Sequence, residues 1–188
     1  MSRYRRNLKP KPKIYFFVEG ETESVFFKAL KKEFRLTSSH TIKILNNGSG
    51  NLLEKTLKQL KESSKYPVDS QTKIFIIFDR DNDNKNKCLK MIKDASKKGI
   101  KIGLSNISFE VWLLAHYKYM NQSMQNEKNL ENELSKQLGS KYKKADPEQI
   151  KSIISDNKVC DAIKNTDSIN KINEYTIDEQ CTNIGMLL

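Results

Sequence analysis

Short runs of consecutive apolar residues alternate with stretches of spaced apolar residues over roughly the first 119 positions of the chain. The clearest run is Ile74 to Phe78, in which every residue is apolar. A run of this kind indicates a strand buried on both faces, as in a parallel sheet that is covered by helices on both sides. The same pattern predicts four strands, at residues 14–18, 41–45, 73–78 and 100–104.

The segments between these runs have the spacing of helices. Residues 25–34 repeat apolar side chains at the three- and four-residue intervals of one helix face, and further helices are expected at about residues 52–63 and 85–98. Alternating strands and helices predict an α/β fold with right-handed crossovers and a doubly wound parallel sheet. In such sheets the binding groups gather beyond the carboxyl ends of the strands.

The sequence changes character beyond residue 119. It becomes rich in Asn, Lys and Glu, with weaker helical patterns at about residues 130–138, 147–154 and 159–163. We therefore expect three regions: a flexible basic arm over residues 1–13, an α/β domain over residues 14–119, and a helical annex over residues 120–188 that packs on the same domain.

The charge balance favours an anionic partner. Lys and Arg number 34 against 23 Asp and Glu, which gives a net charge of +11 and favours nucleic acid. No run reaches the roughly 18 apolar residues of a membrane span, and the opening residues lack the apolar stretch of a signal peptide. We expect no membrane partner and a cytoplasmic location. The three cysteines lie far apart and are expected to be reduced and structural.

The first 13 residues are basic throughout and contain no acid. Pro10 and Pro12 discourage both a helix and a central strand in this segment. A flexible segment of this composition is expected to contact nucleic-acid phosphates. The candidate contacts are Arg3, Arg5, Arg6, Lys9, Lys11 and Lys13.

Acidic residues follow three of the predicted strands. Glu19 follows the first strand with Glu23 one turn into the next helix, Asp79 and Asp81 follow the third strand, and Glu110 comes after the fourth. Asp79 and Asp81 are two residues apart, so in extended backbone their side chains point to the same side. Two carboxylates near 4 Å repel by about 4 kcal/mol at an effective dielectric of 20, and a cation would offset this. Oxygen donors of this kind favour one or two Mg²⁺ or Mn²⁺ ions over zinc.

Each of these acids has an alternative role. Glu21, Glu23 or Asp83 could simply favour the positive end of a helix, although such a role does not require a paired Asp-x-Asp. Glu110 is equally compatible with a ligand role and with stabilising a helix end. Arg80, inside the Asp-x-Asp pair, could contact a substrate phosphate or pair with a neighbouring acid.

Two further features have structural explanations. Phe109, Trp112, Leu113 and His116 have the spacing of a helix stripe packed on a core, and a histidine in such a stripe is more often packed and hydrogen-bonded than a general base. Residues 48–51 open a predicted helix, where backbone N–H groups could hold a phosphate. A tight turn with an Asn cap explains that segment equally well.

Three segments resemble the Toprim domain of topoisomerases, primases and OLD-family nucleases, and more specifically the RloB-like family. They are Phe17–Glu23, which follows the basic arm, Phe78–Asp81 and Ser105–His116, of which the third is the most specific. Residues 181–188 are similar to a degenerate form of a further family segment. The resemblance covers most of residues 3–118 and implies a Toprim-like (Rossmann-like) catalytic domain over residues 14–119, followed by the C-terminal helical annex.

This resemblance implies a metal-dependent nuclease acting on RNA, including tRNA, or on DNA. By position, Glu19, Asp79 and Asp81 match the core metal-binding acids, Glu23 matches the second acid of OLD-like sites, and Glu110 is a candidate addition. The family association further implies a role in anti-phage defence by abortive infection, beside an ABC-type or AAA-type ATPase. The alternative is a catalytically silent nucleic-acid-binding or regulatory subunit of such an ATPase.

Overall fold

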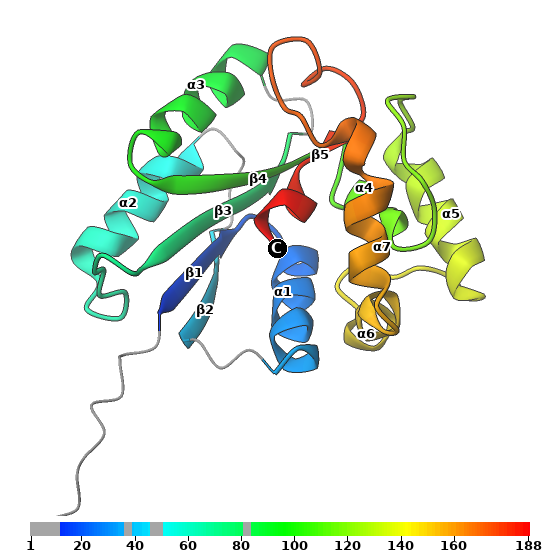
Figure 1. Cartoon of the computed structure of the whole chain (residues 1–188), viewed down its shortest axis with the longest axis horizontal. Coiled ribbons are helices and arrows are strands. Elements are labelled where there is room, and N and C mark those ends of the chain that lie inside the picture. Colours follow the sequence, from blue (N-terminus) through cyan, green and yellow to red (C-terminus); the bar gives the residue numbers. More distant parts are fainter. Residues whose placement is uncertain (1–11, 36–38, 46–50, 81–83) are drawn as a thin grey trace, which may run out of the picture.

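A five-stranded sheet forms the centre of the molecule (Figure 1). The computed structural model describes residues 12–35, 39–45, 51–80 and 84–188. The strand order is β2-β1-β3-β4-β5, with the first four strands parallel and β5 antiparallel to β4. The strands are β1 (Lys13–Val18), β2 (Ser39–Ile44), β3 (Lys73–Asp79), β4 (Ile100–Asn106) and β5 (Cys181–Thr182). The predicted α/β fold is confirmed, but the sheet is not entirely parallel.

Helices cover both faces of this sheet (Figure 1). One face carries α1 (Glu21–Glu33) and α4 (Glu110–Ala115), with α6 (Pro147–Ile154) packed on α1 and α7 (Lys158–Asn165) packed on α4. The other face carries α2 (Leu52–Glu62) and α3 (Lys85–Ser96). On the side of α1, α5 (Glu127–Leu138) packs against α4. The 3₁₀ helices η2 (Asp167–Ile169) and η3 (Ile184–Leu187) complete the described elements.

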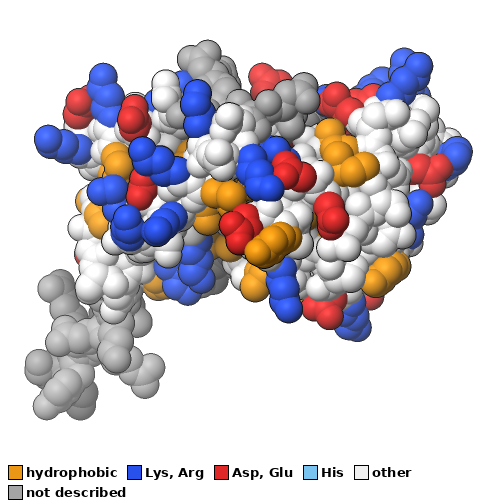
Figure 2. Space-filling view, turned by 90° about the horizontal axis from the view of Figure 1, so that it is seen from above, with side chains coloured by type: hydrophobic (Ala, Val, Ile, Leu, Met, Phe, Trp, Pro, Cys, Tyr) orange, Lys and Arg blue, Asp and Glu red, His pale blue; other side chains and the backbone are white. Residues whose placement is uncertain are grey.

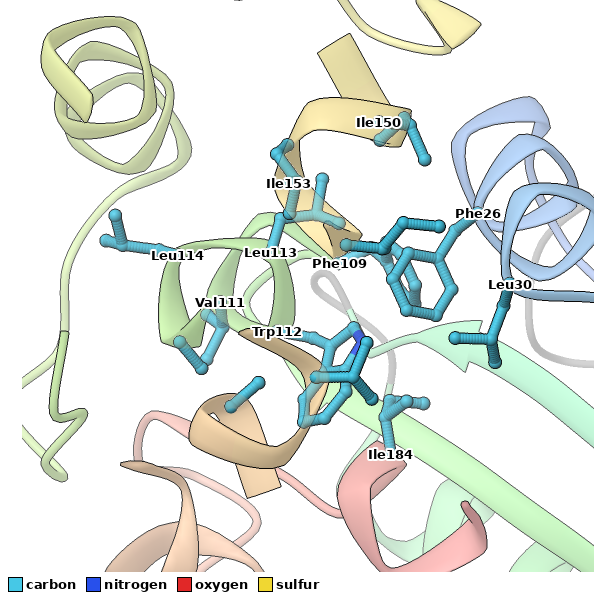
Figure 3. Packing of buried hydrophobic residues seen from close by; sticks show 14 of the residues in the cluster. Phe26, Leu30, Phe109, Val111, Trp112, Leu113, Leu114, Ile150, Ile153 and Ile184 are labelled. Carbon is cyan, nitrogen blue, oxygen red and sulfur yellow. The ribbon is translucent and has the colours of Figure 1, made fainter. Parts of the chain in front are cut away.

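Alternate residues of the central strands enter two separate hydrophobic cores. In β1, Phe16 and Val18 belong to the core on the α1 side, whereas Tyr15 and Phe17 belong to the core beneath α2 and α3. Burial on both faces explains why β1 and β3 are continuous apolar runs in the sequence. Figure 3 shows the first core, in which the labelled side chains are Phe26, Leu30, Phe109, Val111, Trp112, Leu113, Leu114, Ile150, Ile153 and Ile184.

The end of the chain returns to the sheet and is not purely helical. β5 pairs with the carboxyl end of β4, where Ser105 Oγ and Thr182 Oγ1 lie 2.9 Å apart. Asn183 then accepts a hydrogen bond from Leu104 N at 2.8 Å and donates one to Ile102 O at 3.0 Å. A two-residue strand is too short for its apolar period to be recognised, which explains why the sequence pattern missed β5.

The surface mixes charges of both signs. Figure 2 shows Lys and Arg side chains interspersed with Asp and Glu, with the basic groups more numerous on the side of α2 and α3. No helix within the described ranges is long and apolar enough to cross a membrane. Cys88 and Cys181 are buried, Cys160 is exposed, and all three are free.

Candidate active site

The candidate acids lie where the strand order of the sheet reverses, between β1 and β3. From β1 the chain passes through α1 to β2 on one side, and through α2 to β3 on the other side of β1. Ligands in open α/β sheets bind in the crevice beyond the carboxyl ends of the strands at this switch point. Glu19 follows β1 directly and Asp79 is the last residue of β3, while Glu19 N donates to Ile77 O at 3.0 Å. The two acids therefore leave neighbouring strands at the same edge.

Four of the five predicted acids line one pocket of about 390 Å³. Glu19 and Asp79 come from the strand ends, Glu23 from the first turn of α1, and Glu110 from the start of α4. Asp81, the fifth predicted acid, lies outside the described residues. The sequence thus identified side chains that the fold brings together from three separate segments.

Glu23 is a buried acid whose pKa is raised. Its side chain folds back over the turn before α1, so that a Cβ at Gly20 would lie 2.6 Å from Glu23 Oε2. Burial raises the pKa of Glu23 to about 7; backbone hydrogen bonds oppose this rise, and the charges of Glu110 and Glu19 add to it. Glu23 is 4% exposed and is therefore not an ordinary solvated helix-end acid.

Glu110 is held by a residue of the annex. Its side chain is 2% exposed, and Tyr142 donates its phenolic hydrogen to Glu110 Oε1 at 3.0 Å. Burial raises the pKa of Tyr142, and the charge of Glu110 and the hydrogen bond to it raise that pKa further. Tyr142 therefore acts as a donor that fixes the orientation of the Glu110 carboxylate.

The loop between α5 and α6, residues 139–146, contributes two more residues to the pocket. Lys144 and Ala145 line it beside the acids, and Lys144 Nζ pairs with Glu127 and lies 3.7 Å from Glu131 Oε1. Sequence reasoning missed Tyr142 and Lys144, because they lie in a lysine-rich segment that has the composition of a solvated surface. No spacing in the sequence links them to the strand ends.

A family model describes this chain over nearly its whole length. The model of the RloB-like proteins matches residues 14–188. The chain belongs to the RloB-like family. The match extends through the annex and the C-terminal segment as well as the three segments that carry the resemblance. No curated protein and no solved structure matched the chain.

The pocket of this RloB-like protein suits a hard divalent cation in its donor type. Its acids supply only oxygen donors, as Mg²⁺ and Mn²⁺ prefer. Within the ranges that the structure describes, however, no three His, Cys, Asp or Glu side chains are close enough together to hold a metal ion. The donor set therefore fits the predicted ion, while the described carboxylates do not form a closed cage.

Two of the basic residues predicted to bind nucleic acid form ion pairs within this RloB-like structure. Arg80 forms an ion pair at 2.6 Å with Asp178, an acid distant in sequence, and donates to Ile177 O; its contact with a substrate phosphate stays a prediction. Lys13 is the first residue of β1 and pairs with Asp69 at 2.8 Å, so the sheet begins inside the segment expected to be the arm. The remaining predicted contacts, Arg3, Arg5, Arg6, Lys9 and Lys11, lie outside the described residues.

His116 has a structural role in this RloB-like core. It is 3% exposed, its Nδ1 lies 3.0 Å from Trp112 O, and its ring meets those of Phe26 and Trp112 edge to face. Burial lowers the pKa of His116 to about 4, so the ring is neutral near pH 7. The expected packing of the helix stripe is confirmed, since Phe109 and Leu113 are also buried.

Proposed function

We propose that this RloB-like chain is a Mg²⁺- or Mn²⁺-dependent nuclease that hydrolyses phosphodiester bonds of RNA, including tRNA, or of DNA. The observation that carries the proposal is the convergence of Glu19, Glu23, Asp79 and Glu110 on one pocket at the switch point of the sheet. A pocket of carboxylates repels a polyanion unless cations lie between them. The net charge of +11 supports a polyanionic substrate for a protein with such a pocket.

The four acids would hold the ions, together with Asp81 if that side chain reaches the same crevice. When bound, such ions activate a water molecule and stabilise the leaving oxygen of the phosphodiester. Glu19 and Asp79 are supplied by strand ends, which are rigid supports for a ligand. Tyr142 orients Glu110 by its hydrogen bond, as partners of ligating carboxylates commonly do.

A second candidate is a catalytically silent nucleic-acid-binding or regulatory subunit. It is favoured by the open spacing of the carboxylates, because no described group of three is placed to hold an ion. Under this reading the pocket would bind neither Mg²⁺ nor Mn²⁺ with measurable affinity. The metal-binding measurement below separates the two candidates.

The proposed biological role is that of an effector in anti-phage defence, acting with an ABC-type or AAA-type ATPase. It is supported by membership of the RloB-like family and by the hazard that an unrestrained nuclease would pose to its cell. Purification of the tagged protein from its native host should recover an ATPase in a stable complex. A fully active protein that purifies without a partner would count against this role.

The hydrolytic proposal is tested by incubating the purified protein with total RNA and with plasmid DNA in Mg²⁺, Mn²⁺ or EDTA. We expect cleavage in the metal-containing reactions and none in EDTA, together with Mn²⁺ binding by calorimetry. Glu19→Gln should abolish both, because it removes a ligand charge while preserving side-chain size. Glu33→Gln, at the far end of α1, is the matched control and should behave as wild type. Cleavage by Glu19→Gln at the rate of the wild-type protein would contradict the site assignment.

A further inference from the structure

The acidic pocket contains one basic residue among its described lining. Lys144 shares the pocket with Glu19, Glu23, Asp79 and Glu110, and its side chain is 50% exposed. Carboxylates can hold ions, but they cannot bind a phosphate directly. A lysine at the same place can, because an ammonium group forms charge-assisted hydrogen bonds with phosphate oxygens.

The loop that carries Lys144 is hydrogen-bonded to both flanking helices, α5 and α6. Tyr142 N donates to Ser135 Oγ of α5 at 2.8 Å, and Lys143 N donates to Gln149 Oε1 of α6 at 2.8 Å. Gln149 Nε2 in turn donates to Lys141 O at 2.9 Å. These bonds tie the backbone immediately before Lys144 to both α5 and α6, so the position of this backbone does not depend on the ion pairs of the Lys144 side chain.

The residue after Lys144 has an unfavourable backbone conformation. Ala145 has a φ of 56° in the left-handed region and lines the same pocket. Residues with a Cβ seldom adopt this region, and they do so where the surrounding structure requires it, often at binding sites. The turn at Ala145 allows the loop to place Lys144 at the pocket and then enter α6 directly.

The present partners of Lys144 can be exchanged for another anion. The side chains of Glu127 and Glu131 are 50% and 37% exposed, and ion pairs at such exposed positions are weak. Glu127 also lines a neighbouring cavity of about 910 Å³ with Arg80 and Asn106, which follow or end the adjacent strands. The ion pair between Lys144 and Glu127 therefore joins the linings of two hollows at the strand ends, and a polynucleotide that crossed from one hollow to the other would place a phosphate near this pair.

We propose that Lys144 binds a backbone phosphate of the nucleic-acid substrate beside the carboxylate pocket, taking it in exchange for Glu127. This inference rests on the proposed nuclease function and names a residue that contacts its substrate. The phosphate is held from the annex side, while the carboxylates act from the strand ends and from the first turns of α1 and α4.

Binding can be measured apart from cleavage. The full-length protein is titrated with a fluorescein-labelled single-stranded RNA, and with the DNA of the same sequence, in Ca²⁺, with gels to verify that the strand stays intact. Lys144→Ala should weaken binding by about 10- to 100-fold, the value of one charge-assisted hydrogen bond. It should also reduce the slope of log affinity against log salt by about 0.7, the value for one phosphate contact on a single strand.

Lys143→Ala is the matched control, because it removes the same charge from the neighbouring position, which is not part of the pocket's described lining. Its affinity should stay within about twofold of wild type, as expected for an exposed charge without a direct contact. Lys144→Arg should restore most of the affinity. Equal affinities for Lys144→Ala and Lys143→Ala would overturn the inference.

A purely structural role of Lys144 makes a different prediction. If the lysine acted only through its ion pair, Glu127→Gln would weaken binding as much as Lys144→Ala does. If Lys144 binds phosphate, Glu127→Gln frees the ammonium group and binding stays equal or becomes tighter. Weaker binding by Glu127→Gln to the level of Lys144→Ala would therefore also overturn the inference.

The outcomes separate this inference from the nuclease proposal. Binding that depends on Lys144, without cleavage in Mg²⁺ or Mn²⁺, would support the phosphate contact and contradict hydrolysis. Cleavage in which Lys144→Ala matches Lys143→Ala would support hydrolysis and contradict the phosphate contact. Wild-type protein that binds neither strand would contradict both.

Discussion

Removal of the Tyr142 hydroxyl tests whether the annex is part of the site. Tyr142 is 5% exposed and Glu110 is 2% exposed, so their 3.0 Å hydrogen bond is not screened by solvent. A hydrogen bond to a charged group contributes about 1.5–3 kcal/mol, and its loss leaves a buried carboxylate without this donor. We expect Tyr142→Phe to lower the free energy of unfolding by about 2 kcal/mol, since the substitution removes one oxygen and leaves almost no cavity.

The measurement is urea denaturation followed by circular dichroism in EDTA, where the midpoint should fall while the slope stays constant. Tyr175→Phe provides the control, because Tyr175 is 78% exposed and should change stability by less than about 0.5 kcal/mol. Equal midpoints for the two variants would refute the reasoning. Glu110 would then be stabilised without Tyr142, and the annex would have no energetic link to the carboxylates.

Three further predictions follow from the charges of the molecule. In EDTA, the melting temperatures of Glu19→Gln and Asp79→Asn should equal or slightly exceed that of wild type, because each substitution relieves repulsion between carboxylates in the pocket. Added Mn²⁺ should raise the melting temperature of wild type only. An equal rise in the variants would count against the metal site. Deletion of residues 2–12 removes five basic side chains and should lower the slope of log affinity against log salt on duplex DNA by up to about 4. An unchanged slope would show that these side chains do not bind DNA phosphates. The pKa of His116 falls from 6.5 to about 4 on folding, so its stabilising contribution is complete above pH 6.5 and is lost as the pH falls toward 4, by up to about 3 kcal/mol. His116→Phe should show a smaller loss of stability over this pH range, and equal losses in the two proteins would refute the assignment.

The elements of the fold were largely predictable, because each carries its own local pattern. The apolar run predicted a strand at residues 73–78, and the structure extends it by one residue, to Lys73–Asp79. The weak patterns of the annex also correspond to helices, with α6 at Pro147–Ile154 as expected. The tail was not predictable in the same way. β5 has two residues, and its place beside β4 depends on pairing with Asn106 and Ser105 rather than on a period of its own.

The acids of the site were predictable for a topological reason. The proximity of Glu19 and Asp79 can be predicted without knowing how the side chains pack, since the carboxyl ends of neighbouring parallel strands meet at one edge of the sheet. The ion-pair partner of Arg80 was not predictable from the position of Arg80 between two acids. Its partner, Asp178, comes from the far end of the chain, and no periodicity relates the two residues.

The annex residues of the site depend on tertiary packing alone. Tyr142 contacts Glu110 and Lys144 lines the pocket because α6 packs on α1 and α5 packs on α4, which brings the loop between α5 and α6 to the strand ends. The carboxylates and the phosphate-binding lysine proposed above thus belong to different layers of the molecule. A change in α5 or α6 could shift Lys144 relative to the acids without altering any acid. If the chemistry resides in the carboxylates and the contact with substrate resides in the annex, exchanging residues 127–154 between two RloB-like proteins, with Tyr142 retained because it orients Glu110, should transfer substrate preference and leave metal affinity unchanged. Metal affinity that moved with the annex would contradict this division.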